Sequence, residues 1–269
     1  MAQTNPWDPT QYDRFKAERA QPFRDLVALL EPFPGPRVVD LGCGTGELTA
    51  SLVQSLGAVE VLGLDNAPAM LAQALPLSGG PLRFGCADIA AFDDAGSWDI
   101  VLSNAALQWL PDHPAILARW VAALRPGGQL AVQVPANADH PSHRVAAELA
   151  AEEPWTSAFG PAGPPPDAVA ANVLAPERYA RLLWDLGLHR QTVRLQVYAH
   201  ALEGPEQVVE WVKGTTLTRF KARLAPDAYA TFVEVYRQRL LQRLAAEENA
   251  QAGRPYLYPF KRILFWGQA

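Results

Sequence analysis

The chain has 269 residues, 49% of them hydrophobic, and a formal net charge of −5 at pH 7. This length and composition are typical of a globular α/β protein with one large domain, with or without a cap. No run of 18 apolar residues and no apolar N-terminal segment occurs, so we expect no transmembrane helix, no signal peptide and a cytoplasmic location.

Charge indicates which ligands the chain can bind, and cysteine content indicates whether it has disulfides. The sequence contains no block of basic residues, which disfavours a nucleic acid partner. An anionic substrate would therefore be held by a few local cations and not by the overall field. The two cysteines, Cys43 and Cys86, are too few for a disulfide scaffold, and we expect both to be small, buried and reduced.

The first 35 residues predict two helices and no strand. The first covers residues 7–20 and places Tyr12 and Arg19 on one face, and the second covers residues 21–33. This N-terminal region (1–35) is either an ordinary packing pair or a lid over a site, and the sequence supports both interpretations equally.

Strands and helices alternate from residue 36 to residue 135. Apolar runs predict strands at 38–41, 59–65, 82–88, 98–104 and 129–135. Residues 113–128 predict a helix that His113 opens. Such alternation predicts a mostly parallel sheet with helices on both faces, in which ligands bind beyond the carboxyl ends of the strands.

A strand, a glycine turn and a helix start follow one another in residues 38–49, VVDLGCGTGELT. Gly42, Gly44 and Gly46 alternate there, which favours a backbone lying flat against a ligand at a helix N-terminus. A dinucleotide fingerprint would need glycine where Glu47 stands, and a P-loop would need Lys-Ser/Thr after the last glycine. Neither site is therefore expected.

Polar residues stand at the ends of the next strands. Asp65 is placed to accept the two ribose hydroxyls of a nucleoside, and with Asn66 it could also cap the following helix. Asp88 could accept from an adenine amino group while Ile89 packs on the ring. Together with the glycine turn, these residues predict a nucleoside site.

The second half of the chain predicts two insertions on the sheet. Residues 136–175 are proline-rich and too long for an ordinary connection, so they form either a segment covering the site or a mobile one. A helix at 176–188, a strand at 192–202 and a closing strand at 256–267 complete the sheet, whereas 203–254 is helical. We therefore expect a core of 36–135, completed by 176–202 and 255–269, and a substrate cap formed by two helical insertions, 136–175 and 203–254.

The series VVDLGCGTG, VLGLDNAPAML, ADIAAF, DIVLSNAALQWLPDH and LRPGGQLAVQVP resembles the motifs of class I S-adenosylmethionine-dependent methyltransferases. With QYDRFKAERAQPF, EWVKGTTL and PFKRILF, the resemblance to the trans-aconitate 2-methyltransferase family covers nearly the whole chain. It implies a Rossmann-like fold with a mostly parallel seven-stranded sheet and a helical substrate cap. It also implies transfer of a methyl group from S-adenosylmethionine to a carboxylate of trans-aconitate, giving S-adenosylhomocysteine.

The residue analysis and the resemblance together assign sites. The cofactor residues expected are Asp40, Gly42, Cys43, Gly44, Gly46, Asp65, Asn66, Met70, Asp88, Ile89 and Asn104. The substrate residues expected are Tyr12, Arg19, Trp109, Thr215, Arg219, Tyr258 and Arg262, followed by Lys213 and Lys261. Arginine is preferred because its fork matches a carboxylate.

The expected reaction needs no general base, since a carboxylate is already ionised at pH 7. The work is to place an oxygen in line with the methyl group, and Arg19, Gln108 and Trp109 are expected to position it. His113 could act as a base, but we favour its role in opening a helix. No metal is expected, and a monomer is the expected oligomeric state.

Three alternatives remain open. The LQW phrase also occurs in carboxyl methyltransferases that esterify a malonyl group on a carrier protein, so another small-acid substrate is possible. A regulatory protein that binds S-adenosylmethionine without turnover is a second alternative. A nicotinamide oxidoreductase is the third, and Glu47 disfavours it.

Overall fold

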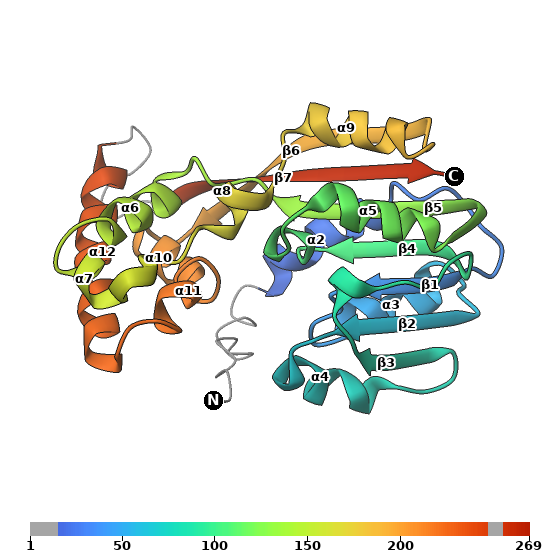
Figure 1. Cartoon of the computed structure of the whole chain (residues 1–269), viewed down its shortest axis with the longest axis horizontal. Helices are drawn as coiled ribbons and strands as arrows, with labels where there is room; N and C mark the ends of the chain where they lie inside the picture. Colours follow the sequence, from blue (N-terminus) through green and yellow to red (C-terminus); the bar gives the residue numbers. More distant parts are fainter. Residues whose placement is uncertain (1–15, 247–254) are drawn as a thin grey trace. The chain divides into compact units, whose positions relative to one another are not determined.

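The computed structural model describes residues 16–246 and 255–269, with only the backbone described for 16–19. Its centre is a seven-stranded sheet of order β3-β2-β1-β4-β5-β7-β6 (Figure 1). The strands are β1 (Arg37–Leu41), β2 (Glu60–Asp65), β3 (Leu82–Cys86), β4 (Trp98–Asn104), β5 (Leu124–Pro135), β6 (Arg190–Leu202) and β7 (Tyr256–Gln268). Neighbouring strands from β3 to β5 are parallel, and β5 pairs with β7 antiparallel. The predicted mostly parallel sheet is confirmed.

The order of the strands explains where polar residues gather. The chain starts at β1, moves outward to β2 and β3, and then returns to β4 on the other side of β1. The loops after β1 and β4 therefore begin side by side at the carboxyl ends of two neighbouring parallel strands. Ligands bind at this position in such folds. The described strands β1 and β4 are almost fully buried, as expected for central strands.

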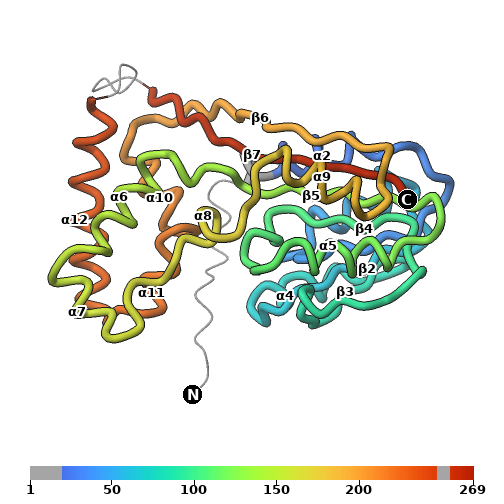
Figure 2. The backbone as a smooth tube through the Cα atoms, turned by 45° about the horizontal axis from the view of Figure 1, so that its top comes forward, coloured from blue at the N-terminus to red at the C-terminus, as the bar shows by residue number. Residues whose placement is uncertain are grey.

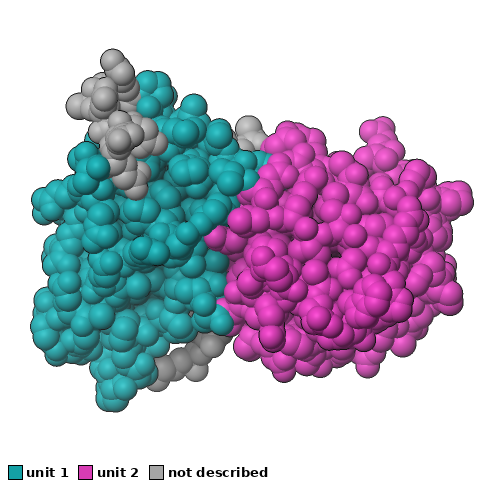
Figure 3. All heavy atoms as spheres, turned by 90° about the horizontal axis from the view of Figure 1, so that it is seen from above, with its two compact units in different colours: residues 1–15, 137–171, 197–261 teal, residues 16–136, 172–196, 262–269 magenta. Residues whose placement is uncertain are grey.

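The described residues divide into two compact units (Figure 3). Of the described residues, unit 2 contains 16–136, 172–196 and 262–269, and unit 1 contains 137–171, 197–246 and 255–261. The two units are described separately below. The predicted role of the helical insertions as a substrate cap stays a prediction.

Unit 2 covers its part of the sheet with helices. These are α2 (Lys16–Val27), α3 (Glu47–Ser55), α4 (Pro68–Ala74), α5 (His113–Ala122) and α9 (Pro176–Asp185). Ile116 and Trp120 of α5 and Leu183 of α9 belong to one buried cluster with strand residues of β1, β4, β5 and β7. Their burial removes the apolar face of each helix from water and holds the helices on the sheet.

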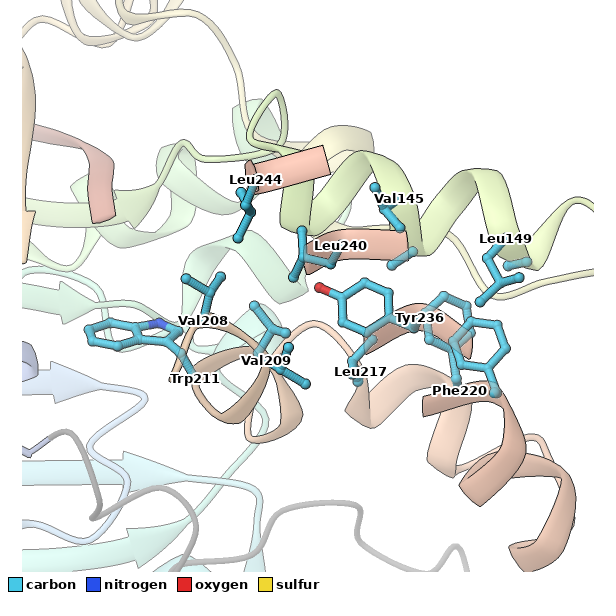
Figure 4. Packing of buried hydrophobic residues seen from close by; sticks show 14 of the residues in the cluster. Val145, Leu149, Val208, Val209, Trp211, Leu217, Phe220, Tyr236, Leu240 and Leu244 are labelled. Carbon is cyan, nitrogen blue, oxygen red and sulfur yellow. The ribbon is translucent and has the colours of Figure 1, made fainter. Parts of the chain in front are cut away.

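Unit 1 is built mainly from helices around a second core. Its helices are α6 (Pro141–Ala150), α7 (Trp155–Phe159), α8 (Ala168–Asn172, which ends at the boundary with unit 2), α10 (Glu206–Lys213), α11 (Thr218–Lys221) and α12 (Pro226–Ala245). Figure 2 shows α6 and α12 side by side. Figure 4 shows the buried side chains of Val145, Trp211, Phe220, Tyr236 and Leu240 in one cluster.

Several predicted boundaries were wrong. The helix expected over 113–128 ends at Ala122, and β5 already begins at Leu124. A residue before proline avoids the helical conformation, so Pro126 ends the helix earlier than its apolar pattern does. The proline-rich segment 136–175, which we expected to be a helical insertion, contains the α-helices α6, α7 and α8, and Pro141 lies in the first turn of α6, where proline is tolerated.

The N-terminal prediction needs a similar correction in its described part. Helix α2 continues through Pro22 and ends at Val27, so 16–27 is one helix and the second helix does not reach residue 33. The packing of Phe23 and Leu26, which are 3% and 0% exposed, offsets the hydrogen bond that proline cannot donate. Residues 7–15 lie outside the described residues.

Candidate functional site

The glycine turn after β1 has a backbone that only glycine adopts easily. Gly42, Gly44 and Gly46 have φ angles of 91°, 56° and 79°. A Cβ on Gly42 would lie 2.2 Å from Cβ of Ala106, and one on Gly46 would lie 2.6 Å from Cζ of Phe84. A Cβ on Gly44 would meet nothing within 4 Å. Two glycines thus serve close packing, whereas the third faces open space where a ligand fits.

Asp65, at the end of β2, fixes this turn. Its Oδ2 accepts a hydrogen bond from the Gly44 N–H at 2.9 Å, and its Oδ1 accepts one from Ala67 N–H at 2.8 Å. The N–H groups of Gly42 and Cys43 donate to the Leu64 carbonyl. Each Asp65 oxygen keeps one lone pair, so the carboxylate can still accept the ribose hydroxyls for which it was predicted.

Asp40 lies beneath the turn and is 2% exposed. Its Oδ2 accepts a hydrogen bond from Thr49 Oγ1 at 2.6 Å, which ties β1 to α3. Burial raises the pKa of Asp40 to about 7, and the nearby Asp65 charge adds to this. The expected direct contact with a cofactor is therefore not favoured, and Asp40 is better described as a support of the turn.

The other predicted cofactor residues of β2 and β3 differ in exposure. Asn66 and Asp88 are exposed, and the Asp88 Oδ1 accepts from Ala90 N–H at 2.9 Å. Met70 and Ile89 are 5% and 7% exposed. The exposed carboxylate remains available to a ligand, while the two apolar side chains present little surface.

The cysteines behave differently from each other. Cys43 is 9% exposed, and burial raises the pKa of its thiol. Cys86, at the last position of β3, is exposed, so the expectation that both are buried was wrong. An edge strand leaves alternate side chains in solvent, and Cys86 is one of them.

The loop after β4 lies against the glycine turn. The contact of Gly42 with Ala106 joins the two loops, and Ala105 has a positive φ of 55°. Asn104 Oδ1 and Gln108 Oε1 are buried and have no hydrogen-bond partner among the described residues, whereas Gln108 Nε2 donates to the Ala105 carbonyl at 2.7 Å. Two unpaired buried acceptors beside the turn favour a ligand with donors there.

Trp109 follows in the same loop and is 40% exposed. The backbone carbonyl of its neighbour Gln108 accepts from Asn172 Nδ2 at 3.0 Å, which anchors the loop. The predicted positioning roles of Gln108 and Trp109 are therefore compatible with their location, at an edge that also carries the glycine turn.

Arg262 of β7 is 6% exposed and lies opposite Pro135 in the register with β5. Its Nη1 donates to Gln133 Oε1 at 3.2 Å. Gln133 is paired in register with Asn104, and its own Nε2 has no hydrogen-bond partner among the described residues. A buried guanidinium beside an unsatisfied amide donor is an arrangement that suits a carboxylate.

His113 opens α5, as predicted, and is 1% exposed. Its Nδ1 lies 2.7 Å from the Tyr179 hydroxyl and its Nε2 lies 3.0 Å from the Leu107 carbonyl. Burial lowers the pKa of His113, so the ring is neutral, with Nε2–H donating to the carbonyl. Both nitrogens are thus used within the fold, and a role as catalytic base is not supported.

The remaining predicted substrate residues of the described chain belong to unit 1. Lys213 pairs with Glu210 at 2.6 Å, and Lys261 pairs with Asp139. The Thr215 hydroxyl donates to the Trp211 carbonyl at 3.4 Å. These contacts satisfy each group within unit 1.

Tyr258 and Arg219 are more deeply placed in unit 1. Tyr258 is 0% exposed and packs edge-on against His140, with ring centroids 4.8 Å apart, which does not favour direct contact with a ligand. The Arg219 side chain is 12% exposed and lies 3.3 Å from Asp167 Oδ2. Tyr12 and the Arg19 side chain lie outside the described residues, although the backbone of Arg19 belongs to α2.

Sequence reasoning missed Gln133 and Thr49. Gln133 lies in the mostly apolar run QLAVQVP, where a second glutamine at a position facing the same side as Gln129 was the available signal. Thr49 lies in the first turn of α3, and only the fold brings its hydroxyl to Asp40. No helix among the described residues is long and apolar enough to cross a membrane.

Comparison with known proteins supports the methyltransferase interpretation. A family model described as "Methyltransferase domain" matches residues 38–128. A trans-aconitate 2-methyltransferase of Deinococcus radiodurans is 47% identical over 263 residues, covering 96% of both chains. A protein of the same name from Streptomyces avermitilis is 38% identical and covers 96% of this chain and 94% of its own.

Solved structures agree on the fold. Phosphoethanolamine N-methyltransferase 2 of Haemonchus contortus, in complex with S-adenosyl-L-methionine, has a TM-score of 0.54 at 17% identity; the match covers 92% of this chain and about half (52%) of that one. The YcgJ protein of Bacillus subtilis has a TM-score of 0.56 at 14% identity, covering 92% of this chain and 97% of that one. At these identities the likeness concerns the fold alone. The sheet, the glycine turn and the full-length relatives together establish that this chain belongs to the trans-aconitate 2-methyltransferase family, within the class I S-adenosylmethionine-dependent methyltransferases.

Proposed function

We propose that the chain transfers the methyl group of S-adenosylmethionine to a carboxylate of trans-aconitate, giving a monomethyl ester and S-adenosylhomocysteine. The observation that carries this proposal is the 47% identity, over 96% of both chains, to a protein named trans-aconitate 2-methyltransferase. A substrate with several carboxylates also agrees with two largely buried arginines, Arg219 and Arg262.

The residues after β1, β2, β3 and β4 fit the cofactor. S-adenosylmethionine supplies an electrophilic methyl group on a sulfonium. In our proposal Asp65 accepts hydrogen bonds from the ribose hydroxyls and Asp88 accepts one from the adenine amino group. Ile89 packs on the adenine ring. The open space beside Gly44 leaves room for the ligand. Asn104 Oδ1, which has no hydrogen-bond partner among the described residues, accepts a hydrogen bond from a donor of the ligand.

The chain's own contribution to the reaction is placement. The acid is already ionised at pH 7, so no proton has to be removed, and the buried neutral His113 is engaged on both nitrogens. The acid oxygen must lie about 3–3.5 Å from the methyl carbon and in line with the departing sulfur. Arg262 neutralises a carboxylate in this arrangement, while Arg19, Gln108 and Trp109 shape the position of the acid.

A methyl-transfer assay tests the substrate. The purified protein is supplied with radiolabelled S-adenosylmethionine and, separately, with trans-aconitate, cis-aconitate, isocitrate or a malonyl carrier protein. Trans-aconitate is expected to give a base-labile labelled ester at the highest kcat/KM. A labelled product from the malonyl carrier alone would overturn the substrate assignment and leave the methyltransferase class intact.

We further propose that the protein acts as a cytoplasmic monomer without a nucleic acid partner. The net charge of −5 and the lack of basic blocks support the last point. Sedimentation velocity at assay concentration is expected to give a single species of about 29.3 kDa, the mass of one chain. A stable species of twice that mass would contradict the monomer.

A further inference from the structure

Four polar side chains form a cluster within unit 1. They are His143 of α6, Asp167 directly before α8, Thr216 between α10 and α11, and Arg219 of α11. Asp167 Oδ2 accepts a hydrogen bond from His143 Nδ1 at 2.7 Å and lies 3.3 Å from Arg219 Nη1. The side chains of His143, Asp167 and Arg219 are 7%, 11% and 12% exposed.

Asp167 is held in place from both sides. Its Oδ1 accepts from the Val169 N–H at 3.0 Å at the start of α8, while Oδ2 faces His143 and Arg219. These partners lower the pKa of Asp167 to about 2 in spite of its burial. The carboxylate is therefore a fixed negative charge that orients the imidazole and the guanidinium.

Arg219 has one buried donor without an acceptor. Its Nη1 forms the ion pair with Asp167, whereas its Nε is buried and has no hydrogen-bond partner among the described residues. The guanidinium carbon lies 4.5 Å from the centroid of the Phe220 ring, which limits its movement. Buried N–H groups without acceptors are costly, and the fork of a guanidinium matches the two oxygens of a carboxylate.

We infer that Arg219, His143 and Thr216 form a binding site for one carboxylate of the acid, with Asp167 as the positioning residue. This inference rests on the proposed function, which makes a polycarboxylate the substrate. Thr216 Oγ1 lies 3.4 Å from His143 Nε2, so a hydroxyl and a ring nitrogen stand beside the guanidinium. The Arg219 guanidinium and the Thr216 hydroxyl supply donors that a carboxylate accepts, and His143, which donates to Asp167 through Nδ1, lines the same cluster.

Isothermal titration calorimetry of the full chain with trans-aconitate tests the site. Titrations are run at about pH 6 and at about pH 8. H143Q, which lacks the imidazole that Asp167 orients, is expected to bind the acid at least about tenfold more weakly than the wild type.

Two further variants separate charge from fold. R219Q is expected to lose at least about tenfold in acid affinity at each pH. R223Q, at an exposed arginine just after α11, is the matched control and is expected to bind as the wild type does. All variants are first compared for their affinity for S-adenosylhomocysteine, which should not change.

The outcomes distinguish this site from the proposed substrate. Unchanged acid affinity in H143Q and R219Q would overturn the site. If the wild type methylates another acid instead of trans-aconitate, the substrate assignment fails, and the same titrations with that acid decide the site.

Discussion

At Arg262, a full charge lies in a position that is only 6% exposed. Its Nη1 donates a hydrogen bond to Gln133 Oε1 at 3.2 Å. Because the fork of a guanidinium matches a carboxylate, R262Q should raise the KM for the acid at least about tenfold, about 1.4 kcal/mol, with cofactor affinity unchanged. Steady-state kinetics with both substrates measures this.

The matched control for Arg262 is R190Q. Arg190 belongs to β6 of the same unit, is 62% exposed and pairs with Glu31. Its loss should leave both KM values unchanged, because an exposed ion pair contributes little. If R262Q behaved like R190Q, Arg262 would be removed from the substrate site.

Asp40 should make stability depend on pH. Its pKa is raised from 3.8 in the unfolded chain to about 7 by burial, so the folded state holds the proton over this range more tightly than the unfolded state does. The stabilisation is complete below about pH 4 and is lost as pH rises to about 7, at up to about 1.4 kcal/mol per pH unit. D40N, which cannot ionise, should lack this fall.

Thermal unfolding of the wild type and D40N between about pH 4 and pH 8 measures the difference. The unpaired amide that D40N introduces costs stability at every pH and does not change the slope. Parallel curves for the two proteins would contradict a raised pKa at Asp40.

At the scale of one element, variants of the glycine turn distinguish glycines that serve packing from a glycine that contacts the ligand. G44A places its Cβ in open space at a φ of 56°, so we expect at least about tenfold weaker binding of S-adenosylhomocysteine with a moderate loss of stability. G57A is the matched control, since Gly57 has a φ of 60° and equal space but lies after α3. G57A should show the same loss of stability and full affinity.

G42A provides the opposite case in the same turn. Its Cβ would overlap Ala106, so it should lower the unfolding temperature more than G44A does. Calorimetry and thermal unfolding of the three variants measure both quantities. Equal cofactor affinity in G44A and G57A would show that the open side of Gly44 does not meet the ligand.

Elements differ in how far sequence predicts them, for physical reasons. The buried strands β1 and β4 contain the apolar runs Val38-Val39 and Ile100-Val101-Leu102, so their type and order were predictable. The end of α5 was not, because its apolar pattern continues into β5 and Pro126 decides the boundary. The helical character of the proline-rich segment was expected, but the bounds of α6 and α7 depend on packing in the unit 1 core.

Site residues were predictable from the sequence where they end a strand or directly follow one. The glycines and Asp65 satisfy this condition. The partners of Arg262 and Arg219 do not, because Gln133 and Asp167 are distant in sequence and are brought there by sheet register and helix packing. The sequence pattern also did not predict side-chain exposure. Cys86 ends β3 and Cys43 follows β1, but Cys86 is exposed and Cys43 is buried.

For the whole molecule, the division into two units predicts where each ligand acts. The proposed cofactor residues belong to unit 2, and the proposed carboxylate cluster belongs to unit 1. Hydrogen exchange with mass spectrometry should therefore show S-adenosylhomocysteine slowing exchange in residues 41–49, 64–70 and 103–110. Trans-aconitate should slow exchange around residues 141–145 and 214–220, because a ligand slows the opening of the segments that it contacts.

Two comparisons make this whole-molecule prediction decisive. A neutral analogue, the trimethyl ester of trans-aconitate, should leave exchange in unit 1 unchanged, since it lacks the charge that the cluster binds. The R219Q variant should lose the protection by trans-aconitate in unit 1 and keep the protection by S-adenosylhomocysteine in unit 2. Protection of unit 2 alone by both ligands would mean that the acid is held by residues such as Arg262, and that the buried Arg219 serves only to bind Asp167.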